Sequence, residues 1–240
     1  MSKQALPDDG LDKVIKYLAK RDGIDKTLKI IRYTSRIIAA VTPATSDLHK
    51  RCTSLDSSVG VSRKAFRLGK FLQDINNIRK CPATDPNMFF LELVANGGEG
   101  IYYFLEQFAW LMKAGAMSKV NEKKMAYFSA WAELLGYIAS VSLSIMKLDQ
   151  IVRDQVVLHV QQEKFIKDEG QEDLRLALQI VALRYTKGLR MALIVQDMAD
   201  AMIAINDIRG GRDVALNHPI TLALAGLTSA AVSTYKLWNA

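Results

Sequence analysis

Apolar residues recur three and four positions apart over most of this 240-residue chain, and sustained strand-like alternation is missing. That period places them on one face of a helix, so the pattern predicts an all-α protein. The intervals between prolines are long, and we expect helices at about 11–42, 47–79, 88–113, 118–160, 172–208 and 216–237. Prolines fall at the expected segment boundaries: Pro7, Pro43, Pro82, Pro86 and Pro219.

Three features interrupt this pattern. The segment from Cys81 to Pro86 is the clearest break, because it holds two prolines. The polar stretch 161–173 is typical of a solvated loop. Gly23 lies inside the first expected helix, where we expect it to mark a kink.

The C-terminal segment is the strongest candidate for a membrane span. The 22 residues from Val214 to Tyr235 contain no Asp, Glu, Lys or Arg, and about 20 apolar residues cross a bilayer. Gly226 and Ala230 are four positions apart, a spacing that lets two helices approach closely in lipid. The alternative is an Ala-rich buried helix of a soluble bundle.

A second candidate span runs from Ala130 to Met146 and is interrupted by a single charge, Glu133. Small residues recur every four positions and indicate a helix–helix contact. They are Ala132, Gly136, Ser140 and Ser144. A tight contact inside a soluble core would show the same row. With the C-terminal segment, it predicts a hydrophobic hairpin or bundle.

A third apolar segment, Met88 to Met112, carries acidic residues seven positions apart. They form one stripe on a helix: Glu92, Glu99 and Glu106. The stripe fits the polar lining of a metabolite passage, because charged residues in membrane helices face protein or water. The pattern favours the simpler interpretation, a solvated edge of a helix lying at the surface.

The net charge of +7 is confined to the first third of the chain. Residues 1–80 carry 17 Lys and Arg against 8 Asp and Glu, whereas residues 81–240 carry 15 against 17. We therefore divide the chain into a basic amphipathic region, 1–80, and a membrane-embedded region, 81–240. A basic surface seeks a polyanion, which is either nucleic acid or an anionic membrane.

Residues 61–78 predict a basic amphipathic helix, which either lies among lipid headgroups or packs against other helices as most surface helices do. Apolar residues gather on one face and basic residues gather opposite, although Lys64 falls within the apolar arc and Phe66 outside it. A lysine can reach the headgroups from such a position. Residues 11–38 show the same pattern, an apolar strip with a basic row beside it. The candidate membrane-binding residues are Arg63, Lys64, Phe66, Arg67, Leu68, Lys70, Phe71 and Leu72.

Several function classes lack support in the sequence. We find no nucleophile elbow, phosphate-binding loop or dinucleotide fingerprint, so we expect no enzyme activity and no cofactor. The three histidines and two cysteines lack metal-ligand spacing, so we expect no metal. The N-terminus does not resemble a secretory signal. No zinc signature or arginine-rich run supports nucleic-acid binding.

Four segments resemble the peroxin eleven family of peroxisomal membrane proteins, in particular its plant members. They are 11–26 with Tyr33, 59–71, 91–103 and 217–221, and the likeness runs in order over nearly the whole chain. The segment 59–71 resembles the family's amphipathic helix, which assigns membrane remodelling to Arg63, Lys64, Phe66, Arg67 and Lys70. One departure is that the chain lacks the Lys-Lys-x-x signal of some relatives.

The resemblance implies a multi-pass protein of the peroxisomal membrane with both termini in the cytosol. It implies membrane tubulation before fission, self-association into a homo-oligomer, and recruitment of a dynamin-related GTPase with its tail-anchored adaptor. The partner surface would be an anionic phospholipid membrane. Two alternatives remain from the residues: a metabolite channel, which overlaps with this function, and a soluble basic module that binds nucleic acid.

Overall fold

The computed structural model describes residues 9–83, 85–210 and 217–239, and these residues form helices without any strand. The all-α prediction is confirmed. In chain order the helices are α1 (Gly10–Ala19), α2 (Arg21–Val41), α3 (Asp47–Phe66), α4 (Phe71–Arg79), α5 (Pro86–Lys113), the short 3-10 helix η1 (Lys119–Asn121), α6 (Glu122–Glu169), α7 (Leu174–Arg209) and α8 (Pro219–Trp238).

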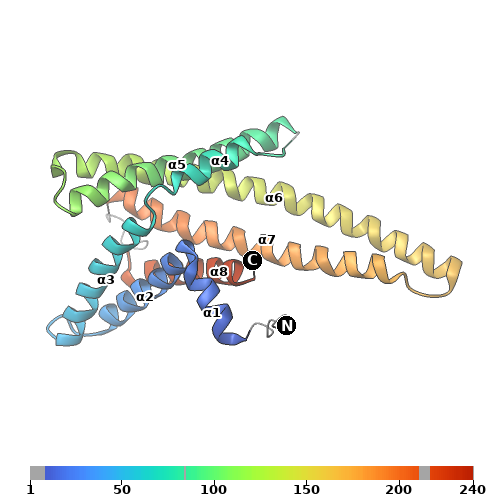
Figure 1. The fold of residues 1–240 in the computed structure, drawn as a ribbon, viewed down its shortest axis with the longest axis horizontal. Helices are drawn as coiled ribbons and strands as arrows, with labels where there is room; N and C mark the ends of the chain where they lie inside the picture. Colours follow the sequence, from blue (N-terminus) through green and yellow to red (C-terminus); the bar gives the residue numbers. More distant parts are fainter. Residues whose placement is uncertain (1–8, 84, 211–216, 240) are drawn as a thin grey trace, which may run out of the picture.

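The helices form a bundle built on a long antiparallel pair, α6 and α7 (Figure 1). Helix α5 packs along the first part of α6, and α4 lies on α5. Helix α8 packs between α7 and α2, and α2 in turn packs on α3. The far ends of α6 and α7 extend beyond the rest of the molecule (Figure 1). The basic region, 1–80, therefore packs against the helices of the region 81–240.

Local sequence signals explain where the helices begin and end. Asp85 accepts hydrogen bonds from the first backbone N–H groups of α5, and Pro86 occupies the first helical position. Asp173 caps α7 in the same way. Helix α6 ends at Glu169 and is capped by Gly170, whose left-handed backbone (φ 72°) suits glycine. The starts of α5 and α7 agree with the sequence patterns to within a few residues.

Two expected helices are each broken into two. Helix α1 ends at Ala19, and the chain turns at Lys20, three residues before Gly23. Gly23 is required there, because a Cβ on it would lie 1.9 Å from the carbonyl oxygen of Tyr17. The expected helix 47–79 is broken between Phe66 and Phe71. Gly69, with φ 71°, supplies that turn.

The polar loop expected at 161–173 is mostly wrong, because α6 continues to Glu169 and the connection to α7 covers 170–173. Polar side chains alone do not end a helix, and α6 contains no proline. At 1.5 Å per residue, its 48 residues extend about 72 Å, more than twice the hydrocarbon thickness of a bilayer.

The distribution of polarity differs from that of a soluble bundle. Two helical stretches, 119–169 and Pro219–Trp238, are long and apolar enough to cross a membrane, and only a third of each apolar window is buried within the chain. Large apolar side chains such as Phe128, Leu135 and Ile138 are exposed on α6. Several charged side chains are buried instead. Apolar residues outside and charges inside suit a protein whose surroundings are partly lipid.

Candidate functional site

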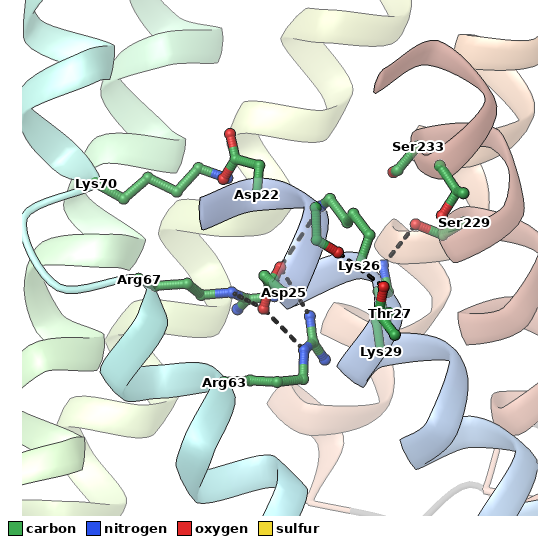
Figure 2. A network of polar contacts seen from close by, with 12 residues as sticks. Asp22, Asp25, Lys26, Thr27, Lys29, Arg63, Arg67, Lys70, Ser229 and Ser233 are labelled. Atoms are coloured by element: carbon green, nitrogen blue, oxygen red, sulfur yellow. Dashed lines mark hydrogen bonds and ion pairs between the residues drawn. The ribbon is translucent and has the colours of Figure 1, made fainter. Parts of the chain in front are cut away.

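The buried charges gather where the ends of α3 and α4 meet α2 and α5. Asp25 of α2 is the centre of this network, and its side chain is 1% exposed. Arg63 Nε donates to Asp25 Oδ1 at 2.9 Å, and Arg67 Nε donates to the same oxygen at 3.1 Å (Figure 2). Both arginines come from the segment that the sequence assigns to membrane binding.

The electrostatics of Asp25 follow from this geometry. Burial would raise the pKa of its carboxyl group, because a charge is poorly solvated inside the protein. The guanidinium groups of Arg67 and Arg63 outweigh that effect and hold the pKa of Asp25 well below its ordinary value. Asp25 is therefore charged at physiological pH, and its charge is stabilised by its two partners.

Glu106 of α5 is the second acidic centre. Its carboxylate accepts hydrogen bonds from Lys64 Nζ at 2.9 Å and from Arg67 Nη1 at 3.2 Å. The hydroxyl group of Tyr102, one turn earlier on α5, also donates to it at 3.1 Å. Arg67 thus bridges Asp25 and Glu106, so a single side chain ties the end of α3 to both α2 and α5.

Positive charge is concentrated around Asp25. Lys26 Nζ lies 3.8 Å from Asp25, and Lys70 Nζ lies 3.5 Å from Asp22 (Figure 2). Burial together with the positive charges of Lys70 and Lys29 lowers the pKa of Lys26 to about 7. The cations on α2, α3 and the turn before α4 therefore outnumber the carboxylates that they pair with directly.

A neighbouring network joins α2 to the last two helices. Lys29 Nζ donates to Asp200 Oδ1 at 2.8 Å and to Ser229 Oγ at 2.6 Å, and Ser229 also hydrogen-bonds Asp200. These contacts link the basic region to α7 and to the candidate span α8. Because Lys29 and Ser229 are nearly inaccessible to solvent, removing either partner would leave a buried polar group unsatisfied.

Both networks border one interior cavity of about 720 Å³. The acidic stripe of α5 faces this cavity, so the favoured interpretation of a solvated edge is wrong. Glu92 accepts from Lys147 Nζ at 2.6 Å, and Glu99 accepts from the hydroxyl of Tyr103 at 2.9 Å. Helix α7 contributes Asp197 and Asp200 to the same lining. Cationic and anionic side chains therefore meet across the cavity.

The remaining predicted membrane-binding residues divide by polarity. Leu68 and Leu72 are exposed, and Leu72 is 58% accessible; Phe66 is also exposed. Phe71 packs edge-on against Phe104 of α5, with ring centroids 5.4 Å apart. The basic members face inward instead, as Arg63 shows with 4% exposure. The apolar part of the segment is accessible, while its basic part is occupied within the chain.

The small-residue rows lie at contacts within the chain. A Cβ on Gly98 of α5 would lie 2.4 Å from the carbonyl oxygen of Ala132 and 2.8 Å from the nitrogen of Gly136 on α6. A Cβ on Gly226 of α8 would lie 2.3 Å from the ring of Tyr33. The other members line the same interior: Ser140 donates to Asp197 at 2.6 Å, and Ser144 and Ala230 are buried.

Sequence reasoning missed that Asp25 and Asp200 pair with basic residues of the first third, and it missed the burial of Asp74. Asp74 is buried where α4 meets α5, and its Oδ2 has no hydrogen-bond partner among the described residues. One signal was available for Asp25 and Asp200: an excess of cations on helices that must pack against others requires carboxylates within the fold. Among the residues described, no group of three His, Cys, Asp or Glu side chains is placed to hold a metal.

Comparison with known proteins decides the family. The family model of peroxisomal biogenesis factor 11 (PEX11) matches residues 11–238. This chain belongs to the PEX11 family. Peroxisomal membrane protein 11A of Arabidopsis thaliana is 42% identical over 236 residues, covering 96% of this chain and 93% of the relative. Peroxisomal membrane protein 11-3 of Oryza sativa subsp. japonica is 41% identical, covering 97% and 90%.

A more distant relative, peroxisomal membrane protein 11B of Arabidopsis thaliana, is 32% identical and covers 96% of this chain and 98% of the relative. No solved structure matches the chain. The resemblance seen in the sequence, including its plant character, is confirmed. PEX11 proteins are membrane proteins of peroxisome biogenesis, which fits the two candidate spans and the apolar outer faces of this chain.

Proposed function

We propose that this PEX11 protein shapes the peroxisomal membrane, elongating and tubulating it before fission, by inserting the amphipathic segment 61–78 into one leaflet and by self-association. The observation that carries the proposal is the exposed apolar surface formed by Leu68, Leu72 and Ile75 at the turn into α4. A helix inserted at headgroup depth adds area to one leaflet and favours curvature. The basic residues of the segment, once they exchange their partners within the chain for headgroups, add attraction to anionic lipids.

We also propose that the protein crosses the membrane more than once and keeps both termini in the cytosol. The two ends of the described chain lie together, which supports an even number of crossings. The hydroxyl of Tyr17 lies 3.4 Å from that of Thr234, and the rings of Tyr17 and Trp238 are 5.8 Å apart. Lys20 Nζ also donates to the carbonyl of Leu237 at 3.4 Å. Recruitment of a dynamin-related GTPase and a tail-anchored adaptor stays a prediction from the resemblance.

Reconstitution of the full-length chain tests the remodelling function. Purified protein is added to vesicles of phosphatidylcholine and phosphatidylserine, and tubules are scored by electron microscopy. We expect tubules from the parent protein and loss of tubules from the double variant Leu68→Asp/Leu72→Asp, because charged side chains do not enter the apolar layer. Both positions are exposed, so the fold should persist.

Leu55→Asp is the matched control, because Leu55 is exposed on α3 outside the segment. Its tubulation should equal that of the parent. In cells, a fluorescent fusion should label peroxisomes and elongate them, and the double variant should label them without elongation. Normal tubulation by Leu68→Asp/Leu72→Asp would refute insertion of this surface.

A second function, passage of small metabolites, is favoured by one specific observation. The interior cavity is polar, borders the candidate span α6 and is lined by Glu92, Glu99 and Glu106. Conductance of the reconstituted protein in planar bilayers tests it. A conductance that persists after all three glutamates are replaced by glutamine would exclude a passage lined by this stripe.

A further inference from the structure

We propose that Asp25 and Glu106 form a latch that holds the segment 61–78 in an inactive position until an anionic membrane replaces them as partners of its cations. The latch rests on the proposed remodelling function and adds its regulation. Its residues come from α2 and α5, outside the amphipathic segment that they restrain.

The contacts account for every basic residue that the segment would offer to lipid. Arg63 and Arg67 are held by Asp25 (Figure 2). Glu106 holds Lys64 and also pairs with Arg67. Lys70 lies against Asp22. A guanidinium or ammonium group paired inside the protein does not contact a headgroup at the same time. In this structure the segment therefore exposes apolar residues, while its basic side chains are paired within the protein and do not reach lipid.

A reversible latch requires that the arginines and lysines make bonds of similar strength to their carboxylate partners and to lipid headgroups. A lipid phosphate or carboxylate offers an arginine the same charge-assisted hydrogen bonds that Asp25 and Glu106 provide. The local excess of cations around Asp25, with Lys26 beside it, adds attraction for an incoming anion. A dense anionic leaflet can therefore compete with the two carboxylates, whereas a neutral one cannot.

The segment also has a hinge and a defined docking surface. The break between α3 and α4 contains Gly69 in a left-handed conformation, which separates the two helices. Helix α4 rests on α5 through Phe71, which contacts Phe104, and through Asp74 beside Gly100. In the proposal, insertion of the whole segment 61–78 carries α4 away from α5, so a bond between these two helices would prevent it.

A disulfide across this contact tests the proposal in the full-length chain. A Cβ on Gly100 would lie 3.3 Å from the Cβ of Asp74, close to the separation found in disulfides. The variant Asp74→Cys/Gly100→Cys is made with Cys52 and Cys81, the two free cysteines, changed to serine. We expect loss of tubulation of phosphatidylserine-containing vesicles in the oxidised protein and recovery after reduction.

The two single-cysteine variants, treated with the same oxidant, are the controls and should tubulate throughout. Equal tubulation by the oxidised and reduced double variant, with the disulfide shown by mass spectrometry, would overturn the latch and leave the proposed function intact. Failure of the parent protein and of the reduced variant alike would overturn both the function and the latch. The two failures are thus distinguishable.

Removing the latch acids should have the opposite effect. Asp25→Asn/Glu106→Gln keeps side-chain size and removes both charges, so we expect tubulation at a lower phosphatidylserine content than the parent requires. Asp56→Asn is the matched control, because Asp56 pairs with Arg32 and Arg36 outside the segment. Unchanged lipid dependence in a double variant with parental helical circular dichroism would contradict the latch. The disulfide variant leaves both acids in place, so it does not depend on how well the double variant folds.

Discussion

At the scale of single residues, Asp74 couples the packing of α4 to pH. Burial and the nearby carboxylate of Glu99 raise its pKa to about 7, with Asp22 adding to the shift and Lys70 opposing it. When α4 is away from α5, the pKa of Asp74 returns toward 3.8. The docked state therefore prefers the protonated acid, and docking weakens as pH rises from about 4 through about 7.

The weakening of α4 docking with rising pH gives a prediction for hydrogen exchange. Amide protection in α4, corrected for intrinsic exchange rates, should fall as pH rises through that range. Asp74→Asn should remove this dependence and keep α4 protected at the upper end, because the amide carries no charge. Asp47→Asn is the control, since Asp47 is exposed at the start of α3. Protection that falls equally in the Asp74→Asn protein would show that another group titrates.

Two adjacent glycines of α5 give a second residue-scale prediction. Gly98→Ala places a methyl group against the backbone of α6, whereas a Cβ at Gly97 meets nothing within 4 Å. Overpacking costs about 1–3 kcal/mol, and alanine favours an exposed helix by about 1 kcal/mol over glycine. Thermal unfolding in detergent should show a lower Tm for Gly98→Ala and an equal or higher Tm for Gly97→Ala. A Tm for Gly98→Ala at or above that of the parent would mean that α5 and α6 separate easily.

At the scale of helices, the sequence predicts which segments are helical better than it predicts where they bend. The period of three and four marks α5, α7 and α8 closely, because each is bounded by a proline, a glycine or a capping aspartate. The breaks at Lys20 and near Gly69 depend on contacts with other helices. The sequence could not predict that Arg63 and Arg67 point inward. A row of basic residues on a helix gives the same sequence pattern whether its partner is lipid or a carboxylate from a distant helix.

The length of α6 leads to an element-scale prediction about topology. If its apolar first half lies in the membrane, its polar second half extends into water, because the helix is about 72 Å long. In intact membranes, Leu135→Cys should be protected from a membrane-impermeant maleimide, and Glu163→Cys should react. Both sites are exposed in the structure, so a difference in their labelling rates reports protection by lipid and not burial within the protein. Labelling of Leu135→Cys at the rate of Glu163→Cys would place α6 outside the membrane.

At the scale of the whole molecule, the basic region and the apolar region are not independent units. Lys29 ties α2 to α7 and α8, and Arg67 ties α3 to α5. Insertion of the amphipathic segment would therefore break the contact of Arg67 with α5, a helix of the region 81–240. The division of the chain at residue 80 stays a prediction.

Self-association provides the last test, because the structure gives Gly226 a contact within the chain. The spacing of Gly226 and Ala230 predicts a close contact between two helices, and in this structure the contact is within the chain: a Cβ on Gly226 would lie 2.3 Å from the ring of Tyr33. Gly226→Ala should therefore destabilise the monomer and lower Tm by about 2–4 °C for each kcal/mol of strain. Cross-linking between copies should stay at the parental yield below that Tm. The exposed neighbour Leu224→Ala is the control and should change Tm less. A parental Tm combined with lost cross-linking would place Gly226 between copies, and α8 would then have to leave α2 for the oligomer to form.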